Sequence, residues 1–294
     1  MRYAIISDIH SNIQALEKAF SVLEDENVDQ IVCLGDIVGY NANPIECIRA
    51  VQSHPKIIHV VQGNHDVDSI VFEHMHISQV MSLSSDAYAG LKHTSSLLSN
   101  EDRVCLASLP KDKLIDNNEF PFWISHYSPN HCTMYGYILN QGDAEDSMDV
   151  LKKYKIEAKV FFFGHTHIPA FIREEGKKKE TLFDMGKHLE GDIYVLDPDR
   201  YYLINPGAIG QPRNGGITSY AVLDTKEGTV SIRGFEYDFK VSRKAVLDAG
   251  YSLSIANRLD PTYDERKVKK KAKRAKKERC KKQQKARDSQ NKKE

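Results

Sequence analysis

Residue types that bind divalent metal ions recur through the sequence in short motifs, most of which also contain glycine. They are Asp8-Ile9-His10, Gly35-Asp36, Gly63-Asn64-His65-Asp66, His126 and Gly164-His165-Thr166-His167. Glycine beside a ligand lets the backbone turn sharply and brings the ligand close. Carboxylate, amide and imidazole groups without cysteine thiolates suit Mn, Fe, Zn or Ni, and the set does not select among these ions.

A binuclear metal centre is the chemistry that such a set serves best. One carboxylate can bridge two cations, while histidine nitrogens and an asparagine carbonyl fill the remaining positions without adding charge. Two metal ions a few ångströms apart activate a water molecule and hold the oxygens of a phosphate during in-line displacement. The motifs therefore predict two divalent ions and the hydrolysis of a phosphate ester.

Each motif also has an ordinary structural interpretation. Asp and Asn residues that follow strands are commonly turn residues or helix N-caps. All of these motifs occur together, however, and each follows a predicted strand. Their coincidence favours the metal site.

The elements expected to position the motifs alternate between strand and helix at the start of the chain. Apolar stretches at 2–7, 30–34 and 56–61 predict strands, and a helix between the last two begins at Pro44. This alternation predicts parallel strands in one sheet, with their carboxyl ends at a common crevice. Further along we expect a mostly helical region at 67–108, a helix at 144–154, and strands at 113–116, 120–125, 158–163, 170–173, 193–196, 201–204, 220–223 and 230–237.

The composition narrows the class of protein. The chain has 294 residues, of which 40% are hydrophobic, and this is ample for a core. No stretch approaches the roughly 18 consecutive apolar residues of a membrane-spanning helix. A strand pattern begins at the first residues, which leaves no room for a signal peptide. Five cysteines without a CxxC pair indicate reduced thiols. We therefore expect a cytoplasmic protein without membrane contact.

The net charge of zero conceals a division along the chain. Residues 266–294 carry 16 Lys or Arg and three acidic residues, a net charge of +13, whereas residues 1–265 carry −13. The apolar stripe of the basic segment is weak, so its first interpretation is a solvated, flexible tail. Weak contact with nucleic acid or another polyanion is the alternative, as is association with the acidic remainder of the chain.

Taken together, the motifs resemble the full motif set of the calcineurin-like metallophosphoesterases. The resemblance also includes the segments GDIVGYNANP and NPGAIGQPR, which are similar to a bacterial and archaeal branch described as phosphodiesterase-like or diadenosine tetraphosphatase-related. It implies an α/β fold in which two mixed β-sheets pack together with helices outside. We accordingly expect a metallophosphoesterase domain at 1–240, a C-terminal helical extension at 241–265 and the basic tail at 266–294.

The resemblance also assigns roles to individual residues. One ion would be bound by Asp8, His10, Asp36 and His167. The other would be bound by Asp36, Asn64, His126 and His165, with Asp36 bridging the two ions. His65 would contact the scissile phosphate or protonate the leaving group, oriented by Asp66, and Asn64 would also lie near the substrate.

Two further residues are candidate substrate contacts. Asn12 follows the first motif, although it fits equally well as the N-cap of the next helix. Arg213 can bind phosphate through two N–H groups, and a solvated loop arginine is the alternative. The segment after Asp36 reads IVGY rather than the VDRG of protein Ser/Thr phosphatases, whose arginine binds phosphate. The resemblance therefore does not extend to a protein-phosphatase activity.

The sequence thus predicts a metal-dependent phosphohydrolase that acts on a small phosphodiester or nucleotide. A phosphomonoesterase or a dinucleoside polyphosphate hydrolase with the same ions is the alternative enzyme. An alternative of another class is a nucleic-acid-associated binding protein whose phosphoesterase site is vestigial. The complete ligand set argues against that last interpretation.

Overall fold

The structure is a computed structural model of the 294-residue chain. It describes residues 1–117, 119–130, 136–154, 158–186, 189–213, 217–261 and 263. Residues 1–261 form one compact unit. The basic tail predicted at 266–294 lies outside the described residues.

The first of two six-stranded sheets has the order β3-β2-β1-β11-β12-β9. Its strands are β1 (Arg2–Ile6), β2 (Gln30–Cys33), β3 (Ile57–Val60), β9 (Ile193–Val195), β11 (Thr218–Asp224) and β12 (Thr229–Phe235). Strands β1, β2 and β3 run parallel, as their alternation with helices predicts. Strand β11 joins β1 in the antiparallel sense, so the sheet is mixed.

The second sheet has the order β4-β5-β6-β10-β7-β8 and is also mixed. Its strands are β4 (Asp112–Ile115), β5 (Phe122–Ser125), β6 (Val160–Phe162), β7 (Ala170–Glu175), β8 (Glu180–Met185) and β10 (Tyr202–Asn205). Strands β5, β6 and β10 are parallel, and β4, β7 and β8 pair in the antiparallel sense. The carboxyl ends of β5 and β6 therefore lie at one edge.

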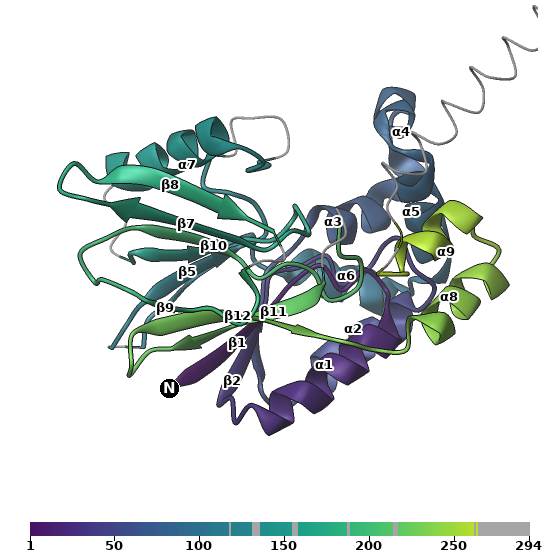
Figure 1. Ribbon diagram of the computed structural model, residues 1–294. Helices are drawn as coiled ribbons and strands as arrows, with labels where there is room; N and C mark the ends of the chain where they lie inside the picture. The colour runs from purple at the N-terminus through teal and green to yellow at the C-terminus, as the bar shows by residue number, and fades with distance from the viewer. Residues whose placement is uncertain are drawn as a thin grey trace, which may run out of the picture. The chain divides into compact units, whose positions relative to one another are not determined.

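The two sheets pack face to face, as Figure 1 shows. In β1 the alternation of side chains divides the core: Tyr3 and Ile5 face the second sheet, where they join Phe122 of β5 and Phe162 of β6. Ala4 and Ile6 face the opposite way, toward the helices. The predicted α/β fold of two mixed sheets with helices outside is confirmed.

The helices cover the outer faces of both sheets and one end of the sandwich (Figure 1). They are α1 (Ile13–Asp25), α2 (Pro44–Ser53), α3 (Asn64–Val71), the short 3-10 helix η1 (Phe72–His74), α4 (Ile77–Ser82), α5 (Ser85–Leu97), α6 (Asn100–Ser108), α7 (Gln141–Lys153), α8 (Phe239–Asp248) and α9 (Leu253–Arg258). Helix α1 buries Leu16 and Leu23 against the first sheet, and α7 buries Met148 and Leu151 against the second. Within the described ranges, no helix combines the length and apolar character needed to cross a membrane.

Candidate metal centre

The loops that follow β1, β2, β3, β5 and β6 converge beyond the carboxyl ends of these strands. The backbone N–H of Asp8 donates to the Gly35 carbonyl oxygen (3.1 Å) and that of His10 to the Asp36 carbonyl oxygen (2.9 Å). The loop after β6 joins them where the His165 N–H donates to Asp8 Oδ2 (3.1 Å). The predicted residues brought together here are Asp8, His10, Asp36, Asn64, His126, His165 and His167.

One ligand group consists of Asp8, His10, Asp36 and His167. All four residues are buried, and one ligand atom from each lies within 4.8 Å of the others. His10 Nε2 lies 3.6 Å from Asp8 Oδ1 and 3.5 Å from Asp36 Oδ2. His167 Nε2 lies 3.3 Å from Asp8 Oδ1. Two carboxylates and two imidazoles therefore direct their ligand atoms at one volume.

A second ligand group, Asp36, His126 and His165, shares Asp36 with the first. His126 Nε2 lies 3.3 Å from Asp36 Oδ2. Asn64 Oδ1 lies 3.2 Å from the same nitrogen, and it adds a neutral oxygen to this group. The shared position of Asp36 is the one that a bridging carboxylate would occupy.

The orientation of the imidazole rings is set from behind by main-chain carbonyl groups. The Nδ1 atoms of His10, His126 and His167 lie 3.1, 2.7 and 2.7 Å from the carbonyl oxygens of Val38, Leu34 and Gln211. A carbonyl oxygen only accepts, so in each neutral ring Nδ1 carries the proton and Nε2 keeps its lone pair. His10 Nε2 and His167 Nε2 lie 3.0 Å apart. When both rings are neutral, neither Nε2 atom carries a proton, so two lone pairs face each other. A cation between them would satisfy both nitrogens.

The remaining ligand atoms also fit a metal ion. Asp8 Oδ1, Asp36 Oδ2 and His165 Nε2 are buried and have no hydrogen-bond partner among the described residues. Leaving such an atom unsatisfied costs about 1–3 kcal/mol, and more when it is charged. Burial raises the pKa of Asp36, but the neighbouring histidines outweigh it and hold the pKa well below its ordinary value. A charged carboxylate with one unsatisfied oxygen is suited to divalent cations.

The Asp36–His126 pair shows the same attraction for positive charge. Burial acts to lower the pKa of His126, and the charge of Asp36 overcomes it and raises the pKa to about 9. A proton therefore competes with a metal ion for His126 Nε2, as is general for metal sites built from histidine.

The backbone at the centre adopts conformations that side chains normally avoid. Non-glycine residues seldom have positive φ. Five of the predicted ligands have φ between 47° and 67°: Asp8, His10, Asp36, His165 and His167. Each such residue costs roughly 1–2 kcal/mol. Strain of this kind persists where the surrounding structure imposes it, and it concentrates at functional sites.

A sequence match that includes these same residues identifies the family of the chain. Residues 1–228, which span both ligand groups, match the model of the calcineurin-like phosphoesterase superfamily domain. The chain belongs to the calcineurin-like phosphoesterase superfamily. With its buried Asp and His cluster, it is a metal-dependent hydrolase of phosphoesters.

Similar proteins are known from archaea and bacteria. An uncharacterised protein of Methanocaldococcus jannaschii is 34% identical over 266 residues, which cover 90% of this chain and 96% of that protein. A metallophosphoesterase from Sphaerobacter thermophilus is 34% identical, with a TM-score of 0.68, over 88% of this chain and 98% of that chain. A hypothetical protein of Pyrococcus horikoshii shares the fold, with a TM-score of 0.68 at 19% identity over 88% and 97% of the two chains.

Asp66 of this phosphoesterase has partners other than those that the resemblance implies. Its two carboxylate oxygens accept hydrogen bonds of 2.9–3.3 Å from the backbone N–H groups of residues 36–38 and of Gly63. No hydrogen bond joins Asp66 to His65 in the described structure, and His65 Nδ1 has no partner there. Asp66 therefore holds the loop that carries Asp36 and does not orient the His65 ring.

His65 is the second residue of α3 and lies beside both ligand groups. Its ring centroid is 4.9 Å from that of His10 and 4.5 Å from that of Tyr40. Gly39 makes room for this ring, because a Cβ at that position would lie 2.6 Å from His65 Nδ1. Burial lowers the pKa of His65 to about 3, so the imidazole is neutral at pH 7. A neutral imidazole can donate one N–H to a phosphate oxygen.

Asn12 is occupied by contacts within the protein. Its Oδ1 accepts the Ala15 N–H (3.2 Å) as the N-cap of α1, and its Nδ2 donates to the Gly210 carbonyl oxygen (2.9 Å) and to Tyr237 Oη (3.0 Å). The residue is 1% exposed. The structure thus supports the N-cap interpretation and leaves no free group on Asn12 for a substrate.

Arg213 approaches the metal centre from the loop that follows β10. Its backbone N–H donates to the His167 carbonyl oxygen (3.3 Å), and its Nη2 donates to Tyr40 Oη (3.4 Å). Burial lowers the pKa of His167, and the charge of Arg213 lowers it further. Arg213 therefore lies next to the ligand groups and is not a solvated loop arginine.

Tyrosines around the centre were not predicted from the sequence. The ring of Tyr137 stacks on His165 with centroids 4.1 Å apart, and that of Tyr127 lies 5.1 Å from the same histidine. Tyr40 packs against His10 and His65. Only Tyr40 carried a signal, because it lies in the GDIVGY segment that contributes to the resemblance.

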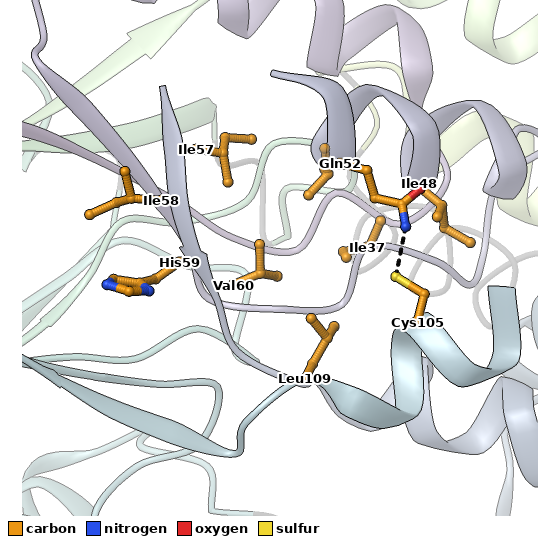
Figure 2. Close-up of a pocket in the computed structure, with 10 residues that line it drawn as sticks. Ile37, Ile48, Gln52, Ile57, Ile58, His59, Val60, Cys105 and Leu109 are labelled. Carbon is orange, nitrogen blue, oxygen red and sulfur yellow. Dashed lines mark hydrogen bonds between the residues drawn. The ribbon is translucent and has the colours of Figure 1, made fainter. Parts of the chain in front are cut away.

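Two cavities differ in their relation to this centre. One, of about 570 Å³, is bordered by Asn64, Lys111 and Tyr127 and thus adjoins the second ligand group. The other, of about 230 Å³, lies between α2, β3 and α6 and is lined largely by apolar side chains (Figure 2). There Gln52 Nε2 donates to Cys105 Sγ at 2.9 Å. The first cavity is the one placed to receive part of a substrate.

Proposed function

We propose that this phosphoesterase binds two divalent metal ions and hydrolyses small phosphodiesters or nucleotides. The observation that carries the proposal is the pair of buried ligand groups that share Asp36. The first ion would be held by Asp8, His10, Asp36 and His167, and the second by Asp36, Asn64, His126 and His165. When bound, the two ions would activate water for attack and neutralise the charge of the phosphate.

The residues around the ions would orient the phosphate and its leaving group. His65 is neutral and next to the first ligand group, so its N–H would donate to a phosphate oxygen. Delivery of that proton to the leaving group requires the negative phosphate to raise the pKa of His65. Arg213 would bind the non-bridging oxygens, since its guanidinium contacts the hydroxyl of Tyr40, whose ring packs against His10.

The cavity beside Asn64 supports an ester with a sizeable organic group. Its volume of about 570 Å³ falls within the range of small-molecule sites. Lys111, Asp68 and Tyr127 at its border offer polar contacts. A phosphodiester or nucleotide would use this space, whereas inorganic phosphate or a small monoester would leave it filled with water.

A substrate screen tests the proposal. The metal-stripped protein would be assayed with phosphodiesters, phosphomonoesters and dinucleoside polyphosphates, with Mn²⁺, Ni²⁺, Zn²⁺ and Mg²⁺ added separately. We expect no turnover with chelator, recovery with one or more of these ions, and the highest kcat/KM on a diester or nucleotide. A higher kcat/KM on monoesters or dinucleoside polyphosphates would show that these compounds, and not phosphodiesters or nucleotides, are the substrate class. Full activity in the chelated protein would refute the metal centre.

The number of ions is tested separately from the rate. Elemental analysis after dialysis should find about two ions per chain in the wild-type protein and fewer in a His126→Gln variant. His74→Gln is a matched control, because His74 is exposed and lies outside both ligand groups. A stoichiometry of one ion, unchanged by His126→Gln, would reduce the site to the first ligand group.

A further inference from the structure

Tyr40 occupies a position between the metal ligands and Arg213. Its ring is 6% exposed and packs against His10 and His65, with centroid distances of 4.8 and 4.5 Å. Its hydroxyl accepts the hydrogen bond from Arg213 Nη2 (3.4 Å). The aromatic body of Tyr40 thus contacts the histidines, while its phenol oxygen contacts the guanidinium.

The backbone around Tyr40 is held by three different parts of the fold. The Asn41 side chain donates to the His10 carbonyl oxygen (2.7 Å), and the Tyr251 hydroxyl donates to the Asn41 carbonyl oxygen (3.1 Å). Helix α5 approaches so closely at Gly90 that a Cβ there would lie 2.3 Å from the Tyr40 nitrogen. The φ angle of +57° at Tyr40 is a strained conformation that this packing maintains.

The Arg213 guanidinium has no carboxylate within ion-pair distance among the described residues, in contrast to Arg49 and Arg258, which pair with Asp102 and Asp86. Its neighbours are phenols. Burial raises the pKa of Tyr137, and the charge of Arg213 acts in the opposite direction. Neutral Tyr40 and Tyr137 do not compensate the positive charge of Arg213, and the charge of Asp8, which raises the pKa of Arg213, acts from beyond ion-pair distance. An anion at the metal centre would supply the missing partner.

We propose that Tyr40 is a positioning residue that holds the Arg213 guanidinium at the metal centre, where Arg213 binds the non-bridging oxygens of the substrate phosphate. This inference rests on the proposed function for its substrate, but it concerns binding of the phosphate group itself. A flexible arginine loses side-chain freedom when it binds an anion. The Tyr40 hydroxyl would reduce this cost by holding the guanidinium in place before the anion arrives.

A double-mutant cycle with Tyr40→Phe and Arg213→Ala tests the inference. Tyr40→Phe keeps the ring against His10 and His65 and removes only the hydroxyl. We expect Arg213→Ala to weaken binding of inorganic phosphate, measured by calorimetry on the metal-loaded protein, by about 10–100-fold, as for a hydrogen bond to a charged group. Tyr40→Phe alone should weaken it by about 2–10-fold, and KM of a phosphate ester should rise with little change in kcat.

The decisive result is the double variant. If Tyr40 acts through Arg213, Tyr40→Phe should have no further effect once Arg213 is alanine. Tyr220→Phe is the matched control, because Tyr220 is also buried and its hydroxyl bonds Glu26; it should leave phosphate binding unchanged. Additive effects of the two substitutions, or wild-type affinity in Tyr40→Phe, would overturn the inference.

Two further outcomes are also decisive. Failure of the wild-type protein to bind phosphate at all would overturn the inference, whatever the substrate screen finds. Conversely, a chain that binds phosphate with the expected coupling but hydrolyses no ester would refute the proposed function and leave the role of Tyr40 standing. Metal content must stay at the wild-type value in both variants, since its loss would assign Tyr40 to the metal site.

Discussion

Replacing Asp36 by asparagine should separate metal binding from folding. Asp36 Oδ1 accepts the His65 N–H (2.8 Å), and Oδ2 lies 3.5 and 3.3 Å from Nε2 of His10 and His126. An amide with its oxygen at the Oδ1 position keeps the first hydrogen bond and directs its NH2 group at the two nitrogens. The variant loses the charge pair with His126 but also its desolvation cost, and these two changes oppose each other.

The size of the expected change in stability follows from the linkage between metal binding and folding. We expect the chelated variant to keep the wild-type stability to about 1 kcal/mol, because each new hydrogen bond contributes about that much. A metal ion that binds only the native state, at about 100 times its Kd, stabilises the protein by about 2.7 kcal/mol. This corresponds to a rise in Tm of roughly 5–10 °C for a chain of this size. Asp36→Asn should lose most of this shift. Its hydrolysis rate should fall by more than the roughly 10–100-fold typical of changes behind a ligand.

The assay compares thermal melts of each protein with EDTA and with Mn²⁺, together with metal content and hydrolysis rate. Asp146→Asn is the control, because Asp146 is exposed on α7 and should behave as wild type. An Asp36→Asn protein with the full wild-type Mn²⁺ shift and rate would refute the bridging role. Unfolding of the chelated variant would instead show that the carboxylate is needed for the fold.

Three other substitutions or deletions have distinct expected results. If His65 protonates the leaving group, His65→Ala should keep both ions and lower kcat by about 10²–10⁴-fold. The loss should be smaller on nitrophenyl esters, which have a good leaving group. An equal loss on good and poor leaving groups would assign His65 to phosphate binding. Asp66→Asn places an NH2 group against backbone N–H donors and should lower the free energy of unfolding by about 2–4 kcal/mol. The loss of stability should be measurable even in EDTA. Unchanged stability with a reduced kcat would instead indicate a catalytic role for Asp66. Deleting 266–294 should leave turnover of small substrates unchanged and weaken any binding of single-stranded nucleic acid. The log–log salt slope of that binding should be about −4 for six contacts, and a salt-insensitive, sequence-selective complex would contradict a non-specific tail.

The sequence alone determined the local elements and the composition of the metal centre. Strand β1, helix α1 after Asn12 and helix α2 at Pro44 lie where their patterns predict, because caps and apolar spacing reflect hydrogen bonds and burial within a few residues. Strand β8 was not predicted. Its residues Glu180–Met185 are exposed or half-buried, and among the described strands they pair with β7 alone, at the edge of the sheet, so their pattern is weak.

The convergence of the motifs at one site was predictable as well. Asp8, Asp36 and His126 each follow a strand, and parallel strands present their carboxyl ends at one edge. The pairing of these strands in two separate sheets was expected only from the resemblance to the family. The continuous apolar run in β1 indicates that both of its faces are buried, but not which sheet or helix buries each of them.

Only the tertiary structure decided the partners of the polar side chains. Asp66 was expected to orient its sequence neighbour His65, yet it binds backbone groups of residues 36–38. Tyr40 and Arg213 are 173 residues apart and no spacing relates them. A side chain binds whichever group lies within about 3 Å, and for residues on different loops that distance depends on how all the strands pack. Residue type and position therefore determine what chemistry is available, whereas packing determines which groups carry it out.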